Sequence, residues 1–359
     1  MLKKVKKLLG RIVAAINVLA VIAMAVSGYS GHLSPTDHPL LSVTGLVFPV
    51  LLGINLAFLV FWIFFHWRTA IIPVAGLLLC YTPIRQFCPL NREKDTSGDC
   101  IKVLSYNVHS YNTFNPTRAF DTVIVDYIKN SGADIVCIQE SVYSKYGGVD
   151  VKEVFKDEYP YQQSMFRTPY QSSHFVYSKY PILSAELIPI ESEGNMSEAY
   201  LLDIDGDTTL LVNNHLETYG LSKEDKQNYE DMVEGNTNER NEKDLLKKII
   251  KSTQIRARQA ETIAAYIKKH GDMPVIVCGD FNDTPLSYVH HTICEGLTDT
   301  YVAAGHGPGF SYVNNSMYER IDHIFCSSHF EPVLSVVDSK NKQSDHYPIY
   351  SVLKKRPKH

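Results

Sequence analysis

The sequence predicts an α/β sandwich, with two sheets and helices outside them, preceded by transmembrane helices. Three observations predict this fold class. Long apolar runs fill most of the first hundred residues, whereas short apolar runs alternate with helical patterns after residue 100. Polar side chains follow directly after several of the short runs. Strands mixed with helices in this way are typical of layered α/β domains.

Composition fits a globular protein with a membrane part. The chain has 359 residues, 45% of them hydrophobic, and a formal net charge of -4. A chain with this charge has no overall basic field, which argues against tight, sequence-indifferent DNA binding. The seven cysteines form no CxxC pair and no framework spacing, so they do not report the redox compartment.

Residues 1–88 form the predicted membrane region. Leu40–Phe65 is long enough to cross a bilayer core, which takes about 20 residues. Ile12–Val26 is an earlier apolar run, and Thr69–Tyr81 is a third that is short for a span. We expect about three transmembrane helices and therefore a multi-pass protein of the bacterial inner (cell) membrane.

Basic residues predict the orientation, because Lys and Arg prefer the cytoplasmic side. The first eleven residues hold five basic side chains and no acid, which places the N-terminus inside. The link near Ser34 then lies outside and Arg68 inside. If Thr69–Tyr81 crosses, the rest of the chain is periplasmic or extracytoplasmic, which is the arrangement we expect. If that run is only interfacial, the rest is cytoplasmic.

A polar linker, residues 89–99, precedes the predicted catalytic domain, residues 100–357. The expected strands are Ile101–Tyr106, Ile135–Ile138, Phe175–Tyr177, Ile182–Leu183, Tyr200–Ile204, Thr209–Val212, Val275–Cys278, Ile321–Cys326, Val333–Val337 and Tyr347–Leu353. The expected helices are Phe120–Asn130 and Glu242–His270, with Ser252 a candidate break. The charged stretch Leu221–Arg240 is either an ordinary loop, which we favour, or a functional lid.

The most informative strand is Val275–Cys278, which Gly279 ends. Asp280 and Asn282 follow in a turn that Pro285 closes. A rigid strand that presents polar side chains at its tip is a common support for catalysis. The alternative is a turn in which these side chains only cap the next helix.

Similar groups lie at the ends of other predicted strands, which favours catalysis. These groups are Asn107, Glu140, Asn213 with His215, and Asp345 with His346. Asp322 lies inside an apolar strand and needs a partner there, since an unpaired buried charge is costly. A protonated histidine is a natural partner.

Phosphate-ester hydrolysis is the chemistry that this set of side chains suits. Carboxylate and amide oxygens suit a hard ion such as Mg²⁺, which neutralises phosphoryl oxygens. Mn²⁺ accepts the same ligands, so the sequence does not separate the two ions. A His–Asp pair activates or steadies the attacking water. The sequence has no Cys/His cluster with zinc spacing, no GxxxxGK loop and no Gly-x-Ser-x-Gly.

Seven short motifs carry a resemblance to a known family. In order they are Ser105-Tyr106-Asn107, Ile138-Gln139-Glu140, Ser178-Lys179-Tyr180-Pro181, Asn213-Asn214-His215-Leu216-Glu217, Gly279-Asp280-Phe281-Asn282, Arg320-Ile321-Asp322 and Ser344-Asp345-His346. With them the chain resembles the endonuclease/exonuclease/phosphatase superfamily, which is DNase I-like, over about residues 100 to 355. The resemblance implies a four-layered α/β sandwich.

The resemblance also implies roles for single residues. Glu140 corresponds to the Mg²⁺ ligand, with Asn107 beside it and Asp345 in the metal or supporting network. Asp280 aligns or deprotonates the attacking water, and Asn282 positions phosphate and water.

Histidines and Asn213 complete the implied site. His346 is the catalytic histidine, held by Asp322. His215 binds phosphate or protonates the leaving oxygen, and Asn213 is a substrate-binding candidate beside it. A histidine at position 215 favours a phosphodiesterase. His174 is expected in the core, with substrate contact as the alternative. The histidines without a motif are expected in packing or surface roles: His109, His290, His291, His306 and His323.

The sequence thus favours a membrane-anchored, Mg²⁺-dependent phosphodiesterase of the nuclease kind. The alternative is a lipid or inositol-phosphate phosphatase, or a sphingomyelinase-like phosphodiesterase, on the same fold. A non-catalytic binding module is the third class. The expected partners are a phosphate-ester substrate, either nucleic acid or a phospholipid headgroup, and the lipid bilayer. The sequence indicates no protein partner.

Overall fold

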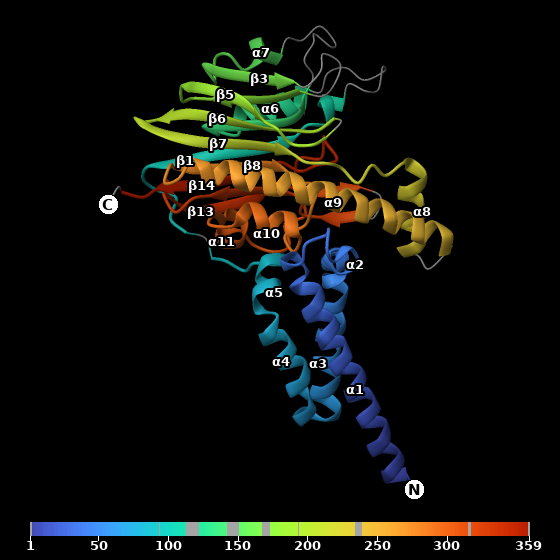
Figure 1. The fold of residues 1–359 in the computed structure, drawn as a ribbon. Coiled ribbons are helices and arrows are strands. Elements are labelled where there is room, and N and C mark those ends of the chain that lie inside the picture. The colour runs from blue at the N-terminus through green and yellow to red at the C-terminus, as the bar shows by residue number, and fades with distance from the viewer. Residues whose placement is uncertain are drawn as a thin grey trace.

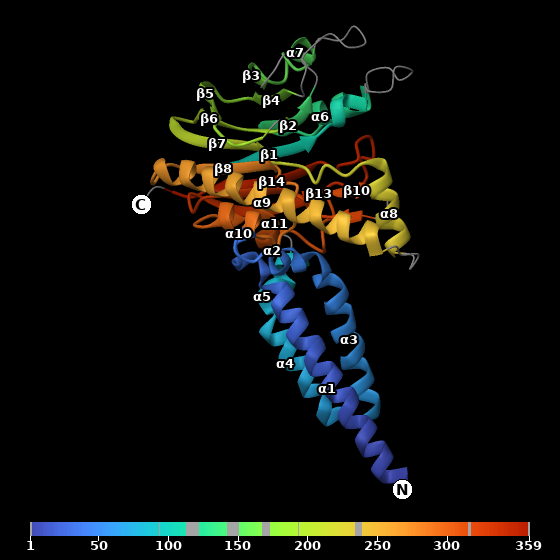
Figure 2. The ribbon, with the colours of Figure 1, turned by 45° about the vertical axis from the view of Figure 1, so that its right-hand side comes forward.

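The computed structural model describes residues 2–92, 94–112, 122–141, 151–166, 173–192, 194–233, 239–314 and 317–357. An N-terminal group of helices stands below a two-sheet α/β domain, and the N-terminus lies at the end far from the sheets (Figure 1). Figure 2 shows the same two parts turned by 45° about the vertical axis.

The first sheet contains the earliest strands of the α/β domain. Among the described residues its order is β13 (Phe330–Val337), β14 (Ile349–Lys355), β1 (Cys100–Asn107), β2 (Ile135–Ser141), β4 (Ser173–Ser178) and β3 (Tyr161–Phe166). Strands β1 and β2 are parallel, and the other pairs are antiparallel. A parallel pair brings the ends of β1 and β2 to the same edge of the sheet.

The second sheet is built around the strand that ends in the Gly-Asp-Phe-Asn sequence. Its described order is β5 (Ile182–Ile188), β6 (Met196–Ile204), β7 (Asp207–His215), β8 (Val275–Asp280), β12 (Asp322–Cys326) and β9 (Thr298–Asp299). Strands β7 and β8 are parallel. A separate hairpin pairs β10 (Tyr312–Asn314) with β11 (Met317–Glu319).

Apolar side chains between the two sheets form the central core, which includes Val103, Cys137, Leu211 and Ile276. Helices cover the outer faces. On the first sheet lie α6 (Thr122–Asn130) and α7 (Val151–Val154), and on the second lie α9 (Glu239–Lys269) and α10 (Tyr288–Cys294). Shorter helical segments are η4 (His109–Asn112), α8 (Lys223–Val233) and α11 (Thr300–Ala304). The predicted four-layered sandwich is therefore confirmed.

Apolar helices form the N-terminal region. They are α1 (Leu2–Gly28), α2 (Pro39–Ser42), α3 (Phe48–Phe65), α4 (Ile71–Leu79) and α5 (Tyr81–Phe87), joined by the 3-10 turns η1 (Ser30–His32), η2 (Val43–Val47) and η3 (Trp67–Ala70). Within the described residues, Lys4–Gly28 and Pro39–Phe65 are long and apolar enough to cross a membrane. The third predicted run, Thr69–Tyr81, falls almost entirely in the first of two helical segments, Trp67–Leu79 and Tyr81–Phe87, which meet at a bend of 63°, so there is a third crossing only if this bent pair is one span.

The interpretation of Leu221–Arg240 as an ordinary loop is wrong for residues 223–233, which form α8. A local signal marks its start. The amide and hydroxyl of Ser222 both donate to the Asp225 carboxylate, and the Asp225 amide donates back to the Ser222 hydroxyl. Such a reciprocal cap stabilises the first turn of a helix. The α9 helix also continues through Ser252, whose hydroxyl bonds to the Lys248 carbonyl at 3.0 Å.

The N-terminal region packs directly on the loop that follows β8. Leu286 is buried in one apolar cluster with Met24, Phe48 and Cys80. The Ser30 hydroxyl donates to the Leu286 carbonyl at 3.4 Å. Leu286 comes six residues after Asp280, so the membrane-type helices support the end of the strand that carries the candidate site.

Candidate active site

Strand register brings three of the predicted side chains together. In the second sheet, β7 pairs His215 with Asp280, and β12 pairs Asp322 with Asp280. Residues directly opposite each other on neighbouring strands project on the same face, so all three converge. Gly279 is required beside them, because a Cβ there would lie 2.0 Å from the Asn214 carbonyl oxygen and its φ is +130°.

The facing sheet supplies Asn107 and Glu140. The Asn107 amide nitrogen donates to Glu140 Oε1 at 3.0 Å and to Asp280 Oδ2 at 3.1 Å, which links the two sheets. Glu140 has φ +52° at a register shift in β2. A non-glycine residue in this left-handed region is strained by about 1 kcal/mol or more, and such strain clusters at functional sites.

His346 and Asp322 form the predicted pair. The Nδ1 atom of His346 is 2.9 Å from Asp322 Oδ2, and Nε2 is 3.6 Å from Asp280 Oδ2. Burial alone lowers the pKa of His346, but the negative charges of Asp322 and Asp280 outweigh it and raise the pKa well above its usual value. Burial raises the pKa of Asp280, and the nearby Asp322 carboxylate adds to this. The pair therefore favours an imidazolium at the site.

His215 lies on the other side of Asp280. Its Nε2 atom is 3.6 Å from Glu140 Oε1 and 3.7 Å from Asp280 Oδ2. His174 stands behind it, with ring centroids 5.8 Å apart, and its Nδ1 is 2.8 Å from Glu198 Oε1. Both His174 and Glu198 are buried, so His174 occupies the core position that we expected and supports His215 from behind.

Asn282 is fixed by its neighbours in the turn after β8. Its backbone N–H donates to Asp280 Oδ1 at 2.8 Å, and its side-chain amide donates to the Leu216 carbonyl at 2.9 Å. The residue has φ +50°, a conformation that asparagine tolerates better than most residues. These bonds hold the Asp280 carboxylate and the Asn282 amide in one orientation.

Asp345 lies beside a histidine for which we expected only a packing or surface role. His109 Nδ1 is 3.5 Å from Asp345 Oδ1 and 3.7 Å from Glu140 Oε2. His109 follows Asn107 by two residues and has φ +43°. The one sequence signal that could have placed His109 at the site was its position close to the strand end.

A cavity of about 500 Å³ joins these groups. The predicted residues on its wall are Glu140, His215, Asp280, Asn282, Asp345 and His346. The loop after β7, helix α8 and the β10–β11 hairpin add Tyr219, Gly220, Leu221, Lys226, Tyr312, Met317 and Glu319. The stretch 221–240 therefore contributes to the site as well as connecting β7 to α9.

Asn213 differs from its predicted substrate-binding role. It is fully buried, and its side-chain oxygen accepts a hydrogen bond from the Gln139 amide at 2.6 Å. It faces the opposite sheet below the cavity, so this amide links the sheets instead of contacting substrate. Asn107 and Asp322 also lie behind the wall, each joined to a residue that lines it.

The donor set fits a hard divalent cation. Glu140 and Asp345 have side chains 26% exposed, and both carboxylates approach the same His109 nitrogen, with Asn107 next to Glu140. Oxygen donors gathered around one cavity are the ligands that Mg²⁺ prefers. Asp280, Asp322 and His346 also bring ligand atoms within 4.8 Å of one another. In that second group, Nδ1 of His346 is already hydrogen-bonded to Asp322, so this nitrogen is not available to a cation.

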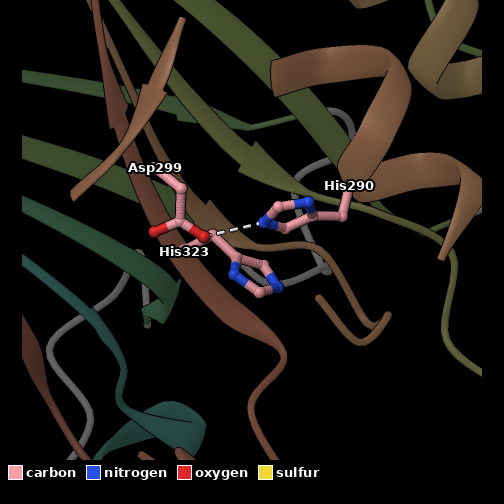
Figure 3. A group of neighbouring side chains, drawn as sticks. All are labelled: His290, Asp299 and His323. Atoms are coloured by element: carbon pink, nitrogen blue, oxygen red, sulfur yellow. Dashed lines mark hydrogen bonds and ion pairs between the residues drawn. The ribbon is translucent and has the colours of Figure 1, made fainter. Parts of the chain in front are cut away.

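A third cluster of ligand-type residues consists of His290, Asp299 and His323 (Figure 3). His290 Nε2 is 2.8 Å from Asp299 Oδ2, while Asp299 Oδ1 accepts from the Tyr301 and Val302 amides. His323 Nε2 donates to the Asp283 carbonyl at 2.9 Å, and burial lowers the pKa of His323 to about 3. The His323 bond supports the turn after Asp280, and the His290–Asp299 pair holds the cap of α11, which is a packing role for both histidines.

Sequence comparison agrees with this geometry. Residues 104–346 match the Endonuclease/Exonuclease/phosphatase family, and residues 10–87 match a domain of unknown function. No curated protein has a matching sequence.

Solved structures share the fold at low identity. The human Nocturnin catalytic domain with bound sulfate is 14% identical, with a TM-score of 0.53 over 74% of this chain and 97% of that chain. An endonuclease/exonuclease/phosphatase from Bacteroides vulgatus is 16% identical, with a TM-score of 0.52 over 72% and 100%. D. rerio TDP2 with a single-strand DNA product is 17% identical, with a TM-score of 0.51 over 72% and 100%. The chain belongs to the endonuclease/exonuclease/phosphatase family and is a hydrolase that acts on phosphate-ester bonds.

Proposed function

We propose that this protein is a membrane-anchored, Mg²⁺-dependent phosphodiesterase. The observation that carries the proposal is the meeting of two histidines, His215 and His346, on either side of the Asp280 carboxylate in one cavity. We assign residues 1–88 to the anchor, 89–99 to the linker and 100–357 to the catalytic domain.

In the proposed reaction, water attacks phosphorus while the bond from phosphorus to the leaving oxygen breaks. Asp280 aligns the water and accepts its proton, and the Asn282 backbone amide holds the Asp280 carboxylate in place. His346, kept protonated by Asp322, donates a hydrogen bond to a phosphoryl oxygen. His215 gives a proton to the leaving alkoxide, which yields an alcohol and a phosphate monoester.

A divalent cation would complete this site. Glu140, Asn107 and Asp345 are the residues that would hold it, with Asp345 and His109 at the outer side. Bound Mg²⁺ would neutralise charge on the phosphoryl oxygens, and Mn²⁺ has the same ligand preference.

The anchor consists of α1 and α3, with the bent pair α4–α5 as a third span. The N-terminus of α1 and the turn between α3 and α4 lie at the same end, away from the catalytic domain (Figure 1). That end carries the basic N-terminal residues and Arg68. Since basic residues favour the cytoplasmic side, we place the catalytic domain on the extracytoplasmic side of the bacterial inner membrane.

The test uses the full chain in detergent, because the N-terminal helices support the loop after β8. We expect hydrolysis of bis(p-nitrophenyl) phosphate with Mg²⁺, loss of activity in EDTA, and recovery when Mg²⁺ is added back. Glu140→Gln should weaken activation, seen as a higher Mg²⁺ concentration at half-maximal rate. Hydrolysis that continues unchanged in EDTA would contradict metal dependence.

A further inference from the structure

We infer that the N-terminal region does more than anchor the chain: it holds the catalytic turn, residues 280–287, in its active conformation, with Arg320 and Gly31 as positioning residues. This role rests on the proposed function and belongs to residues 10–87, which match a domain of unknown function. In both views, α2 and α5 meet the side of the catalytic domain that carries α10 and α11 (Figures 1 and 2).

Arg320 is buried between the two parts of the molecule and joins them. Its Nη1 atom donates to the Pro308 carbonyl at 2.6 Å and to the Phe87 carbonyl at 3.4 Å, and its Nη2 atom donates to the Gln86 carbonyl. Gln86 and Phe87 are the last two residues of α5, and the last carbonyls of a helix have no partner within it. The guanidinium carbon also lies 4.5 Å from the centroid of the Tyr301 ring. The end of α5 and the catalytic domain therefore share one buried cation, and its loss would leave buried carbonyls without their donor, which is costly.

The backbone next to Arg320 holds two catalytic carboxylates. The Ile321 carbonyl accepts a hydrogen bond from the Phe281 amide at 2.8 Å, and Phe281 directly follows Asp280. Asp322, on the other side of Ile321, lies opposite Asp280 on the neighbouring strand. A shift of Arg320 therefore reaches Asp280 through one backbone hydrogen bond and reaches Asp322 along two residues of the chain.

Gly31 holds the far end of the catalytic turn. It is a buried residue of η1 in the N-terminal region. A Cβ atom at this position would lie 2.8 Å from the carbonyl oxygens of both Leu286 and Ser287, closer than real Cβ atoms approach. The turn is thus supported at both ends, at Phe281 beside Arg320, and at Leu286 and Ser287 against Gly31.

Docking of the two parts and support of the catalytic turn are made by different residues. Arg85 of α5 donates to the Val302 carbonyl on α11 at 3.0 Å, and the Asn91 side chain donates to the Gly305 carbonyl at the end of α11 at 2.8 Å. These bonds join the two parts at α11, whereas Arg320 and Gly31 join them at the catalytic turn. Mutation can therefore separate the two roles.

The first experiment adds one methyl group to the full chain in nanodiscs and measures hydrolysis of bis(p-nitrophenyl) phosphate with Mg²⁺. We expect Gly31→Ala to lower kcat per folded molecule by about tenfold to 10²-fold, because a misplacement of about 1 Å at a catalytic group has an effect of this size. The KM and the Mg²⁺ concentration at half-maximal rate should change little, since Glu140 and Asn107 belong to the facing sheet. Gly53→Ala on α3, where the added Cβ would meet no such neighbour within 4 Å, should leave kcat unchanged.

The second experiment changes the buried cation. We expect Arg320→Met to lower kcat in the same way, and Arg320→Lys, which keeps a positive charge and a donor, to recover part of the loss. Arg85→Met is the matched control, because it removes an arginine of α5 that bonds to Val302, and its kcat should stay close to that of the unchanged protein.

The outcomes separate positioning from stability. A merely structural role would lower the unfolding temperature and leave kcat per folded molecule unchanged. That result in Gly31→Ala and Arg320→Met, or an equal loss of kcat in Arg85→Met and Arg320→Met, overturns the inference and leaves the phosphodiesterase standing. If Arg320→Met does not fold, the milder changes Gly31→Ala and Arg320→Lys decide. Absence of hydrolysis by the unchanged protein with Mg²⁺ overturns the proposed function and the inference together.

Discussion

Two buried His–Asp pairs in this molecule have almost the same internal geometry and different surroundings. His346 and Asp322 are 2.9 Å apart, and His290 and Asp299 are 2.8 Å apart. All four side chains are at most 7% exposed. The distance within such a pair therefore does not distinguish a catalytic pair from a structural one.

The second nitrogen of each imidazole makes the difference. His346 Nε2 lies 3.6 Å from Asp280 Oδ2, and the ring lines the 500 Å³ cavity. His290 Nδ1 has no hydrogen-bond partner among the described residues, and its ring packs against His323 and Phe325 at 4.8 and 5.0 Å. A pair becomes useful for catalysis when its outer nitrogen faces a cavity and a second acid.

The largest effect should come from the pair that borders the cavity, His346 and Asp322. We expect His346→Gln to lower kcat for bis(p-nitrophenyl) phosphate by about 10²- to 10³-fold, the usual contribution of a positioned donor to charge that develops in the transition state. Protein yield and thermal unfolding in detergent should change little, because the glutamine amide can still donate a hydrogen bond to the Asp322 carboxylate. Activity close to that of the unchanged protein would remove His346 from the mechanism and end the contrast between the pairs.

The enclosed pair should show the opposite pattern. We expect His290→Leu to lower the free energy of unfolding by about 3 kcal/mol, because it leaves the Asp299 carboxylate buried without its partner. Below the unfolding temperature the remaining activity should stay within a few-fold of normal. The double variant His290→Leu/Asp299→Asn should recover part of the lost stability, since the buried charge is gone. A loss of activity without loss of stability would show that this pair also takes part in catalysis.

The contrast explains how much of the site the sequence could predict. Asp280 was predictable because it directly follows a short apolar run, and His346 because it directly precedes one; phosphate chemistry restricts the residue types that work there. The strand ends converge because β7, β8 and β12 pair in register. The polar residues at the ends of the predicted strands are therefore a local signal of the site.

Other features depend on contacts that no local pattern reports. Asn213 is of a residue type that can bind substrate, yet its side-chain oxygen accepts a hydrogen bond from Gln139 of the facing sheet. His109 reaches the acids because of its positive φ. Helix α8 is too charged to show apolar periodicity, although Ser222 and Asp225 mark its start. The packing of Leu286 on the N-terminal helices joins residues far apart in sequence.

A third acid, Glu319, which is half-buried, sharpens the comparison with the smallest expected effect. Burial, with the nearby Asp283 carboxylate, raises the pKa of Glu319 from 4.5 to about 7, and Arg256 opposes this. The native protein therefore keeps a proton that the unfolded chain releases near pH 4.5. Its contribution to stability is complete below about pH 4.5 and is lost as the pH rises through about 7.

Replacement by glutamine should remove this pH dependence. A shift of this size corresponds to about 3 kcal/mol for a fully enclosed group, and we expect about 1 kcal/mol because Glu319 borders two cavities that open to solvent. Glu319→Gln should therefore gain stability relative to the unchanged protein between pH 4.5 and pH 8, as measured by urea unfolding in detergent. Glu153→Gln, at an exposed position of α7, controls for the loss of one negative charge. If the difference in free energy of unfolding between Glu319→Gln and the unchanged protein stays constant across this pH range, Glu319 is ionised in the native state. An acid at this position then needs no histidine partner to remain charged.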